Sequence, residues 1–221
     1  MRLLYQFPTW MQHLYRGVTW RRDTGVSASK TVYLTFDDGP IPEATPEILD
    51  ILGQYGVKAT FFVVGDNILK YPHIYARMCE EGHRIGNHTM HHIKGTRYSL
   101  DEYLKDVDAC AQVIGSQQAA TDSQPRLADT MLFRPPYGKM TYRQKRAILE
   151  RGYEIVLWDV LTHDYNARYT PERMMDIVRR YTRPGSIINF HDSIKSCGRT
   201  IRVLPQVIEW LLEQGYAIQT L

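Results

Sequence analysis

Two adjacent aspartates follow directly on a run of apolar residues that alternate with polar ones. Asp37 and Asp38 end the segment TVYLTFDD (31–38) and precede a Gly-Pro pair. Carboxylates this close repel each other unless a cation or a hydrogen-bond donor compensates for their charge. An Asp-Gly pair is also common in ordinary turns, which is the alternative to a functional site. If a metal ion binds here, one carboxylate can hold the ion while the other accepts a proton from water.

A histidine cluster supplies further ligands for such an ion. The segment GNHTMHH (86–92) places His88 and His92 four residues apart. On one helical turn this spacing directs both rings to the same side, where they can hold a single ion. Together with one Asp they form a set of two histidines and one carboxylate, which suits Zn²⁺ or a similar divalent ion with open positions. His91 is the alternative to His92, and a solvated turn is the alternative to a metal site.

The elements that must position these residues alternate between strand-like and helix-like segments. Several of the strand-like segments are apolar on both faces, which is typical of parallel strands covered by helices. We therefore expect an α/β fold with a largely parallel sheet, either doubly wound or curled into a barrel with the helices outside. The seven expected strands are 32–36, 58–64, 83–88, 131–134, 153–160, 186–191 and 216–221.

Residues that can do chemistry stand at the carboxyl ends of five of these strands. In parallel α/β folds those ends meet at one rim, which is where such folds carry their sites. The residues are Asp37, Asp38, His88, His92, Arg134, Asp164 and His191.

Helix boundaries are marked by residues with known preferences. Pro42 and Pro171 suit first turns, and Ser99 with Glu102 forms a capping box. Helix ends are expected at Gly56, Gly82 and Gly152, and near Gly115, after which the polar segment 116–130 predicts a surface excursion.

Composition favours one large globular domain. The chain has 221 residues, of which 43% are hydrophobic and 23% charged, so it can bury a sizeable core. The net charge of +3 and the lack of a dense basic run argue against nucleic acid as a partner. Three scattered cysteines, Cys79, Cys110 and Cys197, are too few for a disulfide framework or a CxxC zinc site. The oligomeric state has no signature in the sequence.

The N-terminal segment 1–30 lacks the apolar core of a signal peptide, and no segment is apolar for long enough to be a transmembrane span. The default expectation is a cytoplasmic protein. Trp10, Trp20 and nearby arginines leave open an interfacial anchor at a membrane or in the cell envelope. We expect residues 1–30 to pack on the domain formed by 31–221.

Five segments resemble, in order and spacing, the motifs of the polysaccharide deacetylases, also known as the NodB-homology or carbohydrate esterase family 4 enzymes. The segments are TFDDGP (35–40), HTMHH (88–92), RPPYG (134–138), WDVLTHDY (158–165) and INFHD (188–192). The resemblance implies a distorted (β/α) barrel of about seven parallel strands. It also implies removal of acetyl groups from an acetylated glycan with the help of one divalent metal ion. Zn²⁺ is the first expectation for that ion, and Co²⁺, Ni²⁺ or Mn²⁺ are alternatives.

The resemblance also assigns roles by position. Asp37 resembles the catalytic base, and Arg134 would hold it as an anion. Asp38, His88 and His92 resemble the metal ligands.

On the leaving-group side, His191 resembles the general acid, with Asp164 keeping its imidazole charged. The backbone N–H of Tyr137 would face the developing oxyanion.

The chain departs from the family pattern at three positions. Leu161 stands where the family usually has an acid, and Tyr165 where it usually has Trp. Asn189 replaces a usual Leu of the acetyl pocket, so we group Asn189 and Tyr165 with Tyr137 as residues facing substrate. These departures bear on which acyl group and which glycan are preferred more than on the type of reaction.

Several alternatives remain at this stage. The same site could serve an O-acetyl esterase acting on xylan, or an amidohydrolase acting on a small cyclic imide. A sugar-binding domain without activity would be expected to lack part of the base, metal and acid set. A cysteine hydrolase would use Cys197 with His191, although nothing marks that thiol as activated. The glycan could be peptidoglycan, a chitin-like chain or acetylated xylan.

Overall fold

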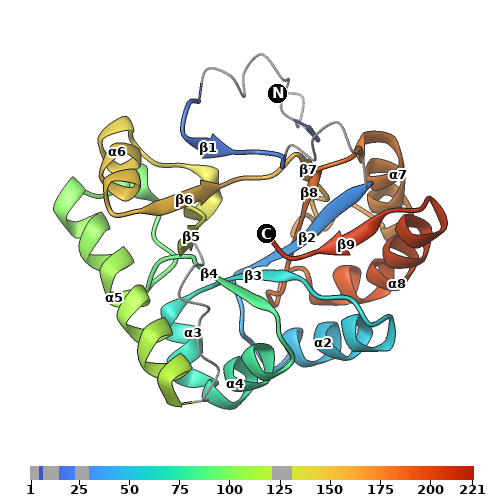
Figure 1. Cartoon of the computed structure of the whole chain (residues 1–221), viewed down its shortest axis with the longest axis horizontal. Helices are drawn as coiled ribbons and strands as arrows, with labels where there is room; N and C mark the ends of the chain where they lie inside the picture. The colour runs from blue at the N-terminus through green and yellow to red at the C-terminus, as the bar shows by residue number, and fades with distance from the viewer. Residues whose placement is uncertain (1–4, 7–14, 23–29, 121–130) are drawn as a thin grey trace.

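The computed structural model describes residues 5–6, 15–22, 30–120 and 131–221, with the backbone alone for 118–120. Its strands form one sheet that is surrounded by helices (Figure 1). The described strands are β1 Val18–Thr19, β2 Thr31–Asp37, β3 Thr60–Val63, β4 Arg84–Asn87, β5 Met131–Phe133, β6 Tyr153–Val156, β7 Val160–Leu161, β8 Ile187–His191 and β9 Ala217–Gln219.

The strand order is β1-β6-β5-β4-β3-β2-β8-β7, and β9 pairs with the first half of β2. Every pairing between these strands is parallel. An isolated antiparallel bridge between Arg21 and Ser186 joins the chain after β1 to the start of β8. The fold is the distorted (β/α) barrel of the resemblance, and the expectation of a largely parallel sheet is confirmed.

The prediction of a single strand over 153–160 is wrong. β6 pairs with β5 and β1, whereas β7 pairs with β8 at the other end of the sheet. Between them, the N–H of Leu157 donates to the Thr19 carbonyl and the N–H of Asp159 donates to the Ile187 carbonyl. This apolar run therefore changes partners midway, which only the tertiary pairing reveals. With β1 also unpredicted, the described residues hold nine strands where seven were expected.

The helices are α2 Thr45–Gln54, α3 Gly65–Lys70, α4 Pro72–Glu80, α5 Leu100–Ala120, α6 Tyr142–Glu150, α7 Pro171–Tyr181 and α8 Cys197–Glu213, with short 3₁₀ turns at Gly95–Arg97 and Pro136–Gly138. They lie on the outside of the strands (Figure 1). None of the helices in the described ranges has the length and apolar character that crossing a bilayer requires.

Most of the expected helix signals are confirmed. Glu102 accepts a hydrogen bond from the Ser99 N–H at 2.9 Å, which completes the capping box ahead of α5. Pro171 lies in the first turn of α7, and the three expected glycines follow α2, α4 and α6 with positive φ.

Two helix boundaries differ from the prediction. Pro42 lies ahead of α2, whose first turn contains Pro46 instead. α5 continues past Gly115 to Ala120, so the first part of the expected surface excursion is helical. The rest of that excursion, 121–130, lies outside the described residues.

Stacked aromatic rings fix the central strands. The ring of Phe36 in β2 lies 5.0 Å from that of Phe61 in β3 and 5.8 Å from that of Phe190 in β8. All three side chains are fully buried, and each such burial contributes about 1.5–3 kcal/mol. The residue after Phe36 is Asp37 and the residue after Phe190 is His191, so this core sets the positions of both polar side chains.

The described part of the N-terminal segment contacts the sheet. The Tyr5 carbonyl accepts a hydrogen bond from the Leu161 N–H at 3.0 Å, and the Gln6 amide donates to Asp159 at 3.2 Å. Trp20 is buried. The division into a segment 1–30 and a domain 31–221 stays a prediction, because most of residues 1–30 lie outside the described ranges.

Candidate active site

The carboxyl ends of the central strands bring the chemically active residues to one rim of the sheet. Asp37 is the last residue of β2 and is paired in register with His191, the last residue of β8. His88 follows β4, and Arg134 follows β5. The expectation that these residues meet is therefore confirmed for the rim as a whole.

Asp38, His88 and His92 form a three-residue cluster whose ligand atoms all lie within 4.8 Å of one another. Asp38 Oδ1 is 3.0 Å from Nε2 of His92 and 3.6 Å from Nε2 of His88. Burial alone would raise the pKa of the Asp38 carboxyl, but the neighbouring His88 and His92 rings hold that pKa well below its usual range. The carboxylate is thus in the form that a metal ligand requires.

The orientation of the His88 ring fits a cation. Its Nδ1 lies 2.7 Å from the Arg134 carbonyl oxygen, which can only accept, so Nδ1 carries the proton. In a neutral ring Nε2 then directs a lone pair at the Asp38 carboxylate. A cation bound between these two acceptors would be held by both of them. The buried hydrogen bond on the far nitrogen is also the usual support of a metal-binding histidine.

The prediction that His88 and His92 lie on one helical turn is wrong. His88 and His92 lie in an irregular loop after β4, in which Thr89 and His92 have positive φ angles of 69° and 54°. The loop is held by side chains, since Asn87 Oδ1 accepts from the Thr89 N–H at 2.8 Å and Thr89 Oγ1 accepts from the Ile93 N–H at 3.2 Å.

The structure also decides between His92 and His91. The His91 ring is exposed and pairs with the Asp106 carboxylate, with Asp66 3.9 Å away on its other side. It takes no part in the Asp38 cluster. His92, four residues after His88, is therefore the second histidine of the cluster, as the spacing predicts.

Asp37 is buried next to the Asp38, His88 and His92 cluster and is paired with an arginine. Nη1 of Arg134 donates to Asp37 Oδ1 at 2.6 Å. Nε and Nη2 of the fully buried Arg134 donate to the carbonyls of Val156 and Leu157, and the guanidinium lies 4.0 Å above the Phe62 ring. With three sides held, Arg134 presents a fixed donor to Asp37.

Across the rim, His191 and Asp164 form a second charged pair. Asp164 Oδ1 lies 2.7 Å from His191 Nδ1, and Asp164 Oδ2 accepts from the backbone N–H of His191 and from the Thr200 hydroxyl. Burial by itself would lower the pKa of His191, but the Asp164 carboxylate outweighs it and raises that pKa to about 10. His191 is therefore an imidazolium at neutral pH, with Nε2 as the nitrogen left to donate a proton.

Replacing Asp164 by Asn should shift this titration. The raised pKa means that the His191 proton stabilises the fold fully below the ordinary value of 6.5, and that this stabilisation is lost as the pH rises through about 10. Without the Asp164 carboxylate, the largest contribution that opposes burial is lost, so we expect the pKa of His191 in D164N to fall well below its wild-type value. NMR titration of the metal-free chain measures this directly. A His191 pKa that stays near its wild-type value in D164N would contradict the assignment.

Two tyrosines with expected substrate roles are exposed at the rim. The side chain of Tyr137 is 59% exposed, and its ring lies 4.8 Å from that of His92. Among the described residues no acceptor is bonded to the Tyr137 N–H. Tyr165 is 39% exposed, its ring stands edge-on to His191 at 5.0 Å, and its hydroxyl lies 3.0 Å from His163 Nδ1.

Asn189 is placed differently from these two tyrosines. Its side chain is completely buried and makes hydrogen bonds to Asp37, Arg134 and Thr35. It was expected among the residues facing substrate, but its contacts are with the candidate base and its arginine. The sequence could not show this, because it does not say which neighbours meet a polar residue inside a sheet.

Asp192 is a site residue that sequence reasoning missed. Its buried carboxylate accepts from the Gly39 N–H at 2.9 Å and from the Thr45 hydroxyl at 2.7 Å, and burial raises its pKa to about 8. A Cβ atom on Gly39 would lie 1.8 Å from Asp192 Oδ2, so only glycine fits there. Asp192 thus secures the loop that carries Asp38. The one sequence signal that could have identified Asp192 is its position directly after His191.

Backbone strain is concentrated at the rim. The non-glycine residues with left-handed φ angles in the described ranges are Asp38, Thr89, His92, Tyr137 and His163. All five belong to the site motifs. Such conformations cost about 1–3 kcal/mol each and persist where the surroundings enforce them, commonly at functional sites.

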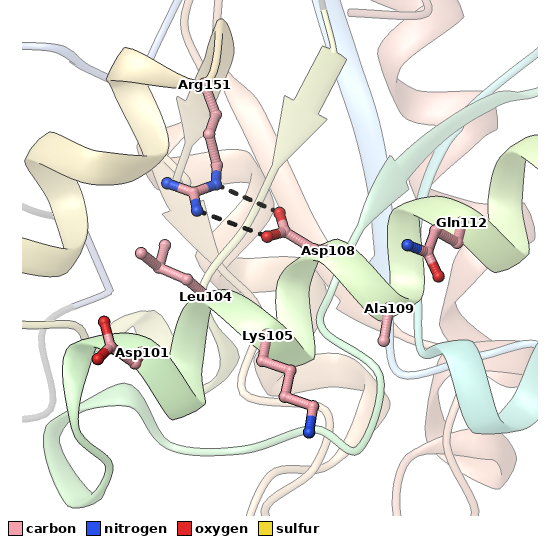
Figure 2. A pocket seen from close by; sticks show the side chains of 7 residues that line it. All are labelled: Asp101, Leu104, Lys105, Asp108, Ala109, Gln112 and Arg151. Atoms are coloured by element: carbon pink, nitrogen blue, oxygen red, sulfur yellow. Dashed lines mark hydrogen bonds and ion pairs between the residues drawn. The ribbon is translucent and has the colours of Figure 1, made fainter.

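Two other features do not contribute to this site. A surface hollow of about 410 Å³ lies along α5 beside the Asp108–Arg151 ion pair (Figure 2), and none of the rim residues lines it. The thiol of Cys197 donates to the Ile194 carbonyl at 3.4 Å. Among the described residues no hydrogen bond joins Cys197 to His191, so the cysteine hydrolase has no support.

Residues 24–156 match the family model for polysaccharide deacetylases. The chain belongs to the polysaccharide deacetylase family. The matched range includes Asp37, Arg134 and the cluster of Asp38, His88 and His92, whereas Asp164 and His191 lie beyond it. The relatives described next match 91% and 92% of the chain, so their similarity also extends beyond residue 156.

Two relatives and one solved structure illustrate this similarity. The chain is 36% identical over 213 residues to a chitooligosaccharide deacetylase of Bradyrhizobium sp. (strain ANU 289), covering 91% of this chain and 94% of the relative. It is 31% identical over 204 residues to a peptidoglycan-N-acetylglucosamine deacetylase of Bacillus cereus, covering 92% and 90%. It superposes on the crystal structure of the Bc1960 peptidoglycan N-acetylglucosamine deacetylase with a TM-score of 0.84 at 31% identity, covering 97% and 95%.

Proposed function

We propose that residues 31–221 form a metal-dependent hydrolase that removes acetyl groups from N-acetylated sugars of a peptidoglycan or chitin-like glycan. Its relatives deacetylate N-acetylated glycans of both kinds. The observation that carries the proposal is the position of Asp37, a carboxylate outside the ligand set, beside the Asp38, His88 and His92 cluster. A protonated histidine, His191, stands in register beside Asp37.

Asp38, His88 and His92 are the residues that would hold the divalent ion. Two imidazoles and one carboxylate suit Zn²⁺ best, and Co²⁺, Ni²⁺ or Mn²⁺ are also compatible with this ligand set. When bound, such an ion would polarise the acetyl carbonyl and lower the pKa of an attacking water.

Asp37 acts as the general base in this proposal. It takes a proton from the water that attacks the acetyl carbon. Arg134 fixes the position of this carboxylate through the 2.6 Å hydrogen bond from its Nη1. The N–H of Tyr137 faces the oxyanion that develops on the former carbonyl oxygen, and one preorganised donor of this kind contributes about 3 kcal/mol to transition-state binding.

His191 completes the reaction as the general acid. As the bond between the acetyl carbon and the sugar nitrogen breaks, His191 Nε2 protonates that nitrogen, so that acetate and a free amino sugar are released. Asp164 holds the ring by Nδ1 and keeps it charged until this step.

The loss of activity on removing His191 should depend on the leaving group of the substrate. We expect His191→Ala to lower kcat by about 10²- to 10⁴-fold on N-acetylated oligosaccharides, since an amide nitrogen needs a proton to leave. On an activated aryl acetate, whose leaving group needs no proton, the loss should be about tenfold or less. Equal losses on both substrates, measured with the same enzyme preparation, would count against proton donation by His191.

The substrate class is tested by acetate release. Metal-loaded protein is incubated in parallel with chitooligosaccharide, peptidoglycan and acetylated xylan, each with and without a chelator, and acetate is quantified. The proposal predicts chelator-sensitive release from one or both N-acetylated glycans. Release from xylan alone would identify an O-acetyl esterase. No release from any of the three would direct the search to small amides.

A further inference from the structure

Asn189 contacts the candidate base, but its side chain is shielded from solvent. It is the third residue of β8, paired in register with Thr35 of β2, two residues ahead of the Asp37–His191 pair. Its side chain is fully buried. A buried amide is costly unless its polar atoms are bonded, and an apolar side chain of the same branching could fill this space without that cost. The contacts of the amide therefore require an explanation.

The orientation of the amide is determined by its neighbours. One amide atom lies 2.5 Å from Nη1 of Arg134, and because a guanidinium only donates, that atom is the carbonyl oxygen Oδ1. The other amide atom, Nδ2, then lies 3.2 Å from Asp37 Oδ2 and donates to it. The opposite orientation would place an N–H against Arg134 and an oxygen against a carboxylate.

These contacts close a ring around the candidate base. Arg134 Nη1 donates to Asp37 Oδ1 and to Asn189 Oδ1, while Asn189 Nδ2 donates to Asp37 Oδ2. Arg134 alone leaves the carboxylate free to turn about its terminal torsion, which is soft in aspartate. The second donor, on the other oxygen, removes that freedom.

We propose that Asn189 is a positioning residue that fixes the plane of the Asp37 carboxylate, so that one lone pair stays directed at the attacking water. This inference rests on the proposed role of Asp37 as base. It does not require Asn189 to touch the substrate, which its burial prevents. Asn189 should accordingly act on kcat and leave KM nearly unchanged.

The test uses two variants of Asn189 and one matched control. Asn189→Leu keeps the branching of the side chain and removes both polar contacts. Asn189→Asp keeps an acceptor for Arg134 but turns an acceptor toward Asp37. Thr35→Val is the control, because the Thr35 hydroxyl contacts Arg134 Nη1 at 2.9 Å and Asn189 Oδ1 at 3.0 Å but not Asp37. It removes a buried polar contact from the same cluster without removing a donor to the base.

We expect N189L and N189D to lower kcat by about 10- to 100-fold, the range for loss of a hydrogen bond to a charged group, with KM changed less than about threefold. T35V should lower kcat clearly less than either Asn189 variant does. Metal content should match the wild type in all three variants, because none of the changed residues is a ligand. If N189L retains kcat, or if T35V loses as much as N189L, the inference is overturned.

Crystal structures of the metal-loaded wild type and of both Asn189 variants give a readout that does not depend on activity. The inference predicts that the Asp37 carboxylate turns by more than about 30° once the second donor is lost. An unmoved carboxylate in both variants overturns it, whatever the kinetics show. If instead the wild type releases no acetate from any glycan, the proposed function fails, and these structures still decide whether Asn189 orients Asp37.

Discussion

Replacing Asp37 by Asn is expected to lower kcat by about 10²- to 10⁴-fold and to leave the bound metal in place. The amide keeps the shape of the side chain but cannot take a proton from water. The proposed metal ligands are Asp38, His88 and His92, so all three remain in this variant. Acetate release and metal analysis on the same preparation measure the two effects together.

A matched control for this variant is Asp50→Asn on α2. Asp50 carries an exposed ion pair with Arg77 and lies outside the rim, so its loss should leave both activity and metal content unchanged. Near-normal turnover by D37N would remove Asp37 from the role of base. Loss of metal from D37N would show that the two adjacent carboxylates do not have the separate tasks assigned to them.

Replacing His88 by Ala should abolish both metal binding and activity. His88 is the buried member of the cluster, its ring is held by the Arg134 carbonyl, and Ala offers no ligand atom in its place. We expect far less than one ion per chain and a fall in kcat of more than about 10³-fold, since a catalytic ion supplies several kcal/mol of charge stabilisation.

His73→Ala is the control for this variant, because His73 is an exposed histidine at the start of α4. It should bind metal and release acetate like the wild type. A His88→Ala protein that retained a stoichiometric ion would place the metal elsewhere. Taken with D37N, the pair of variants separates a residue that holds the ion from one that moves a proton.

The rim could be predicted from the sequence because two independent signals coincide there. Apolar runs predict where parallel strands end, and Asp37, Arg134 and His191 are polar residues at three of those ends. Strands that pair in parallel deliver their ends to one edge whatever the loops do. An approximate assignment of the strands is therefore enough to predict that these residues meet.

The local geometry could not be predicted in the same way. The loop holding His88 and His92 uses left-handed backbone at Thr89 and His92, which side-chain spacing does not reveal. The run 153–160 divides into two strands because its halves pair at opposite ends of the sheet. The contacts of Asn189 depend on Arg134, which is distant in the sequence and is held by its own set of carbonyl acceptors.

The central claim is that one cation, held by Asp38, His88 and His92, works beside Asp37, which does not bind the ion. Its most direct test is acetate release from an N-acetylated oligosaccharide by protein stripped of divalent ions and then titrated with Zn²⁺. The account predicts no release from the stripped protein and full recovery at about one ion per chain, with no recovery in H88A. Full activity in the rigorously stripped wild-type protein would contradict it.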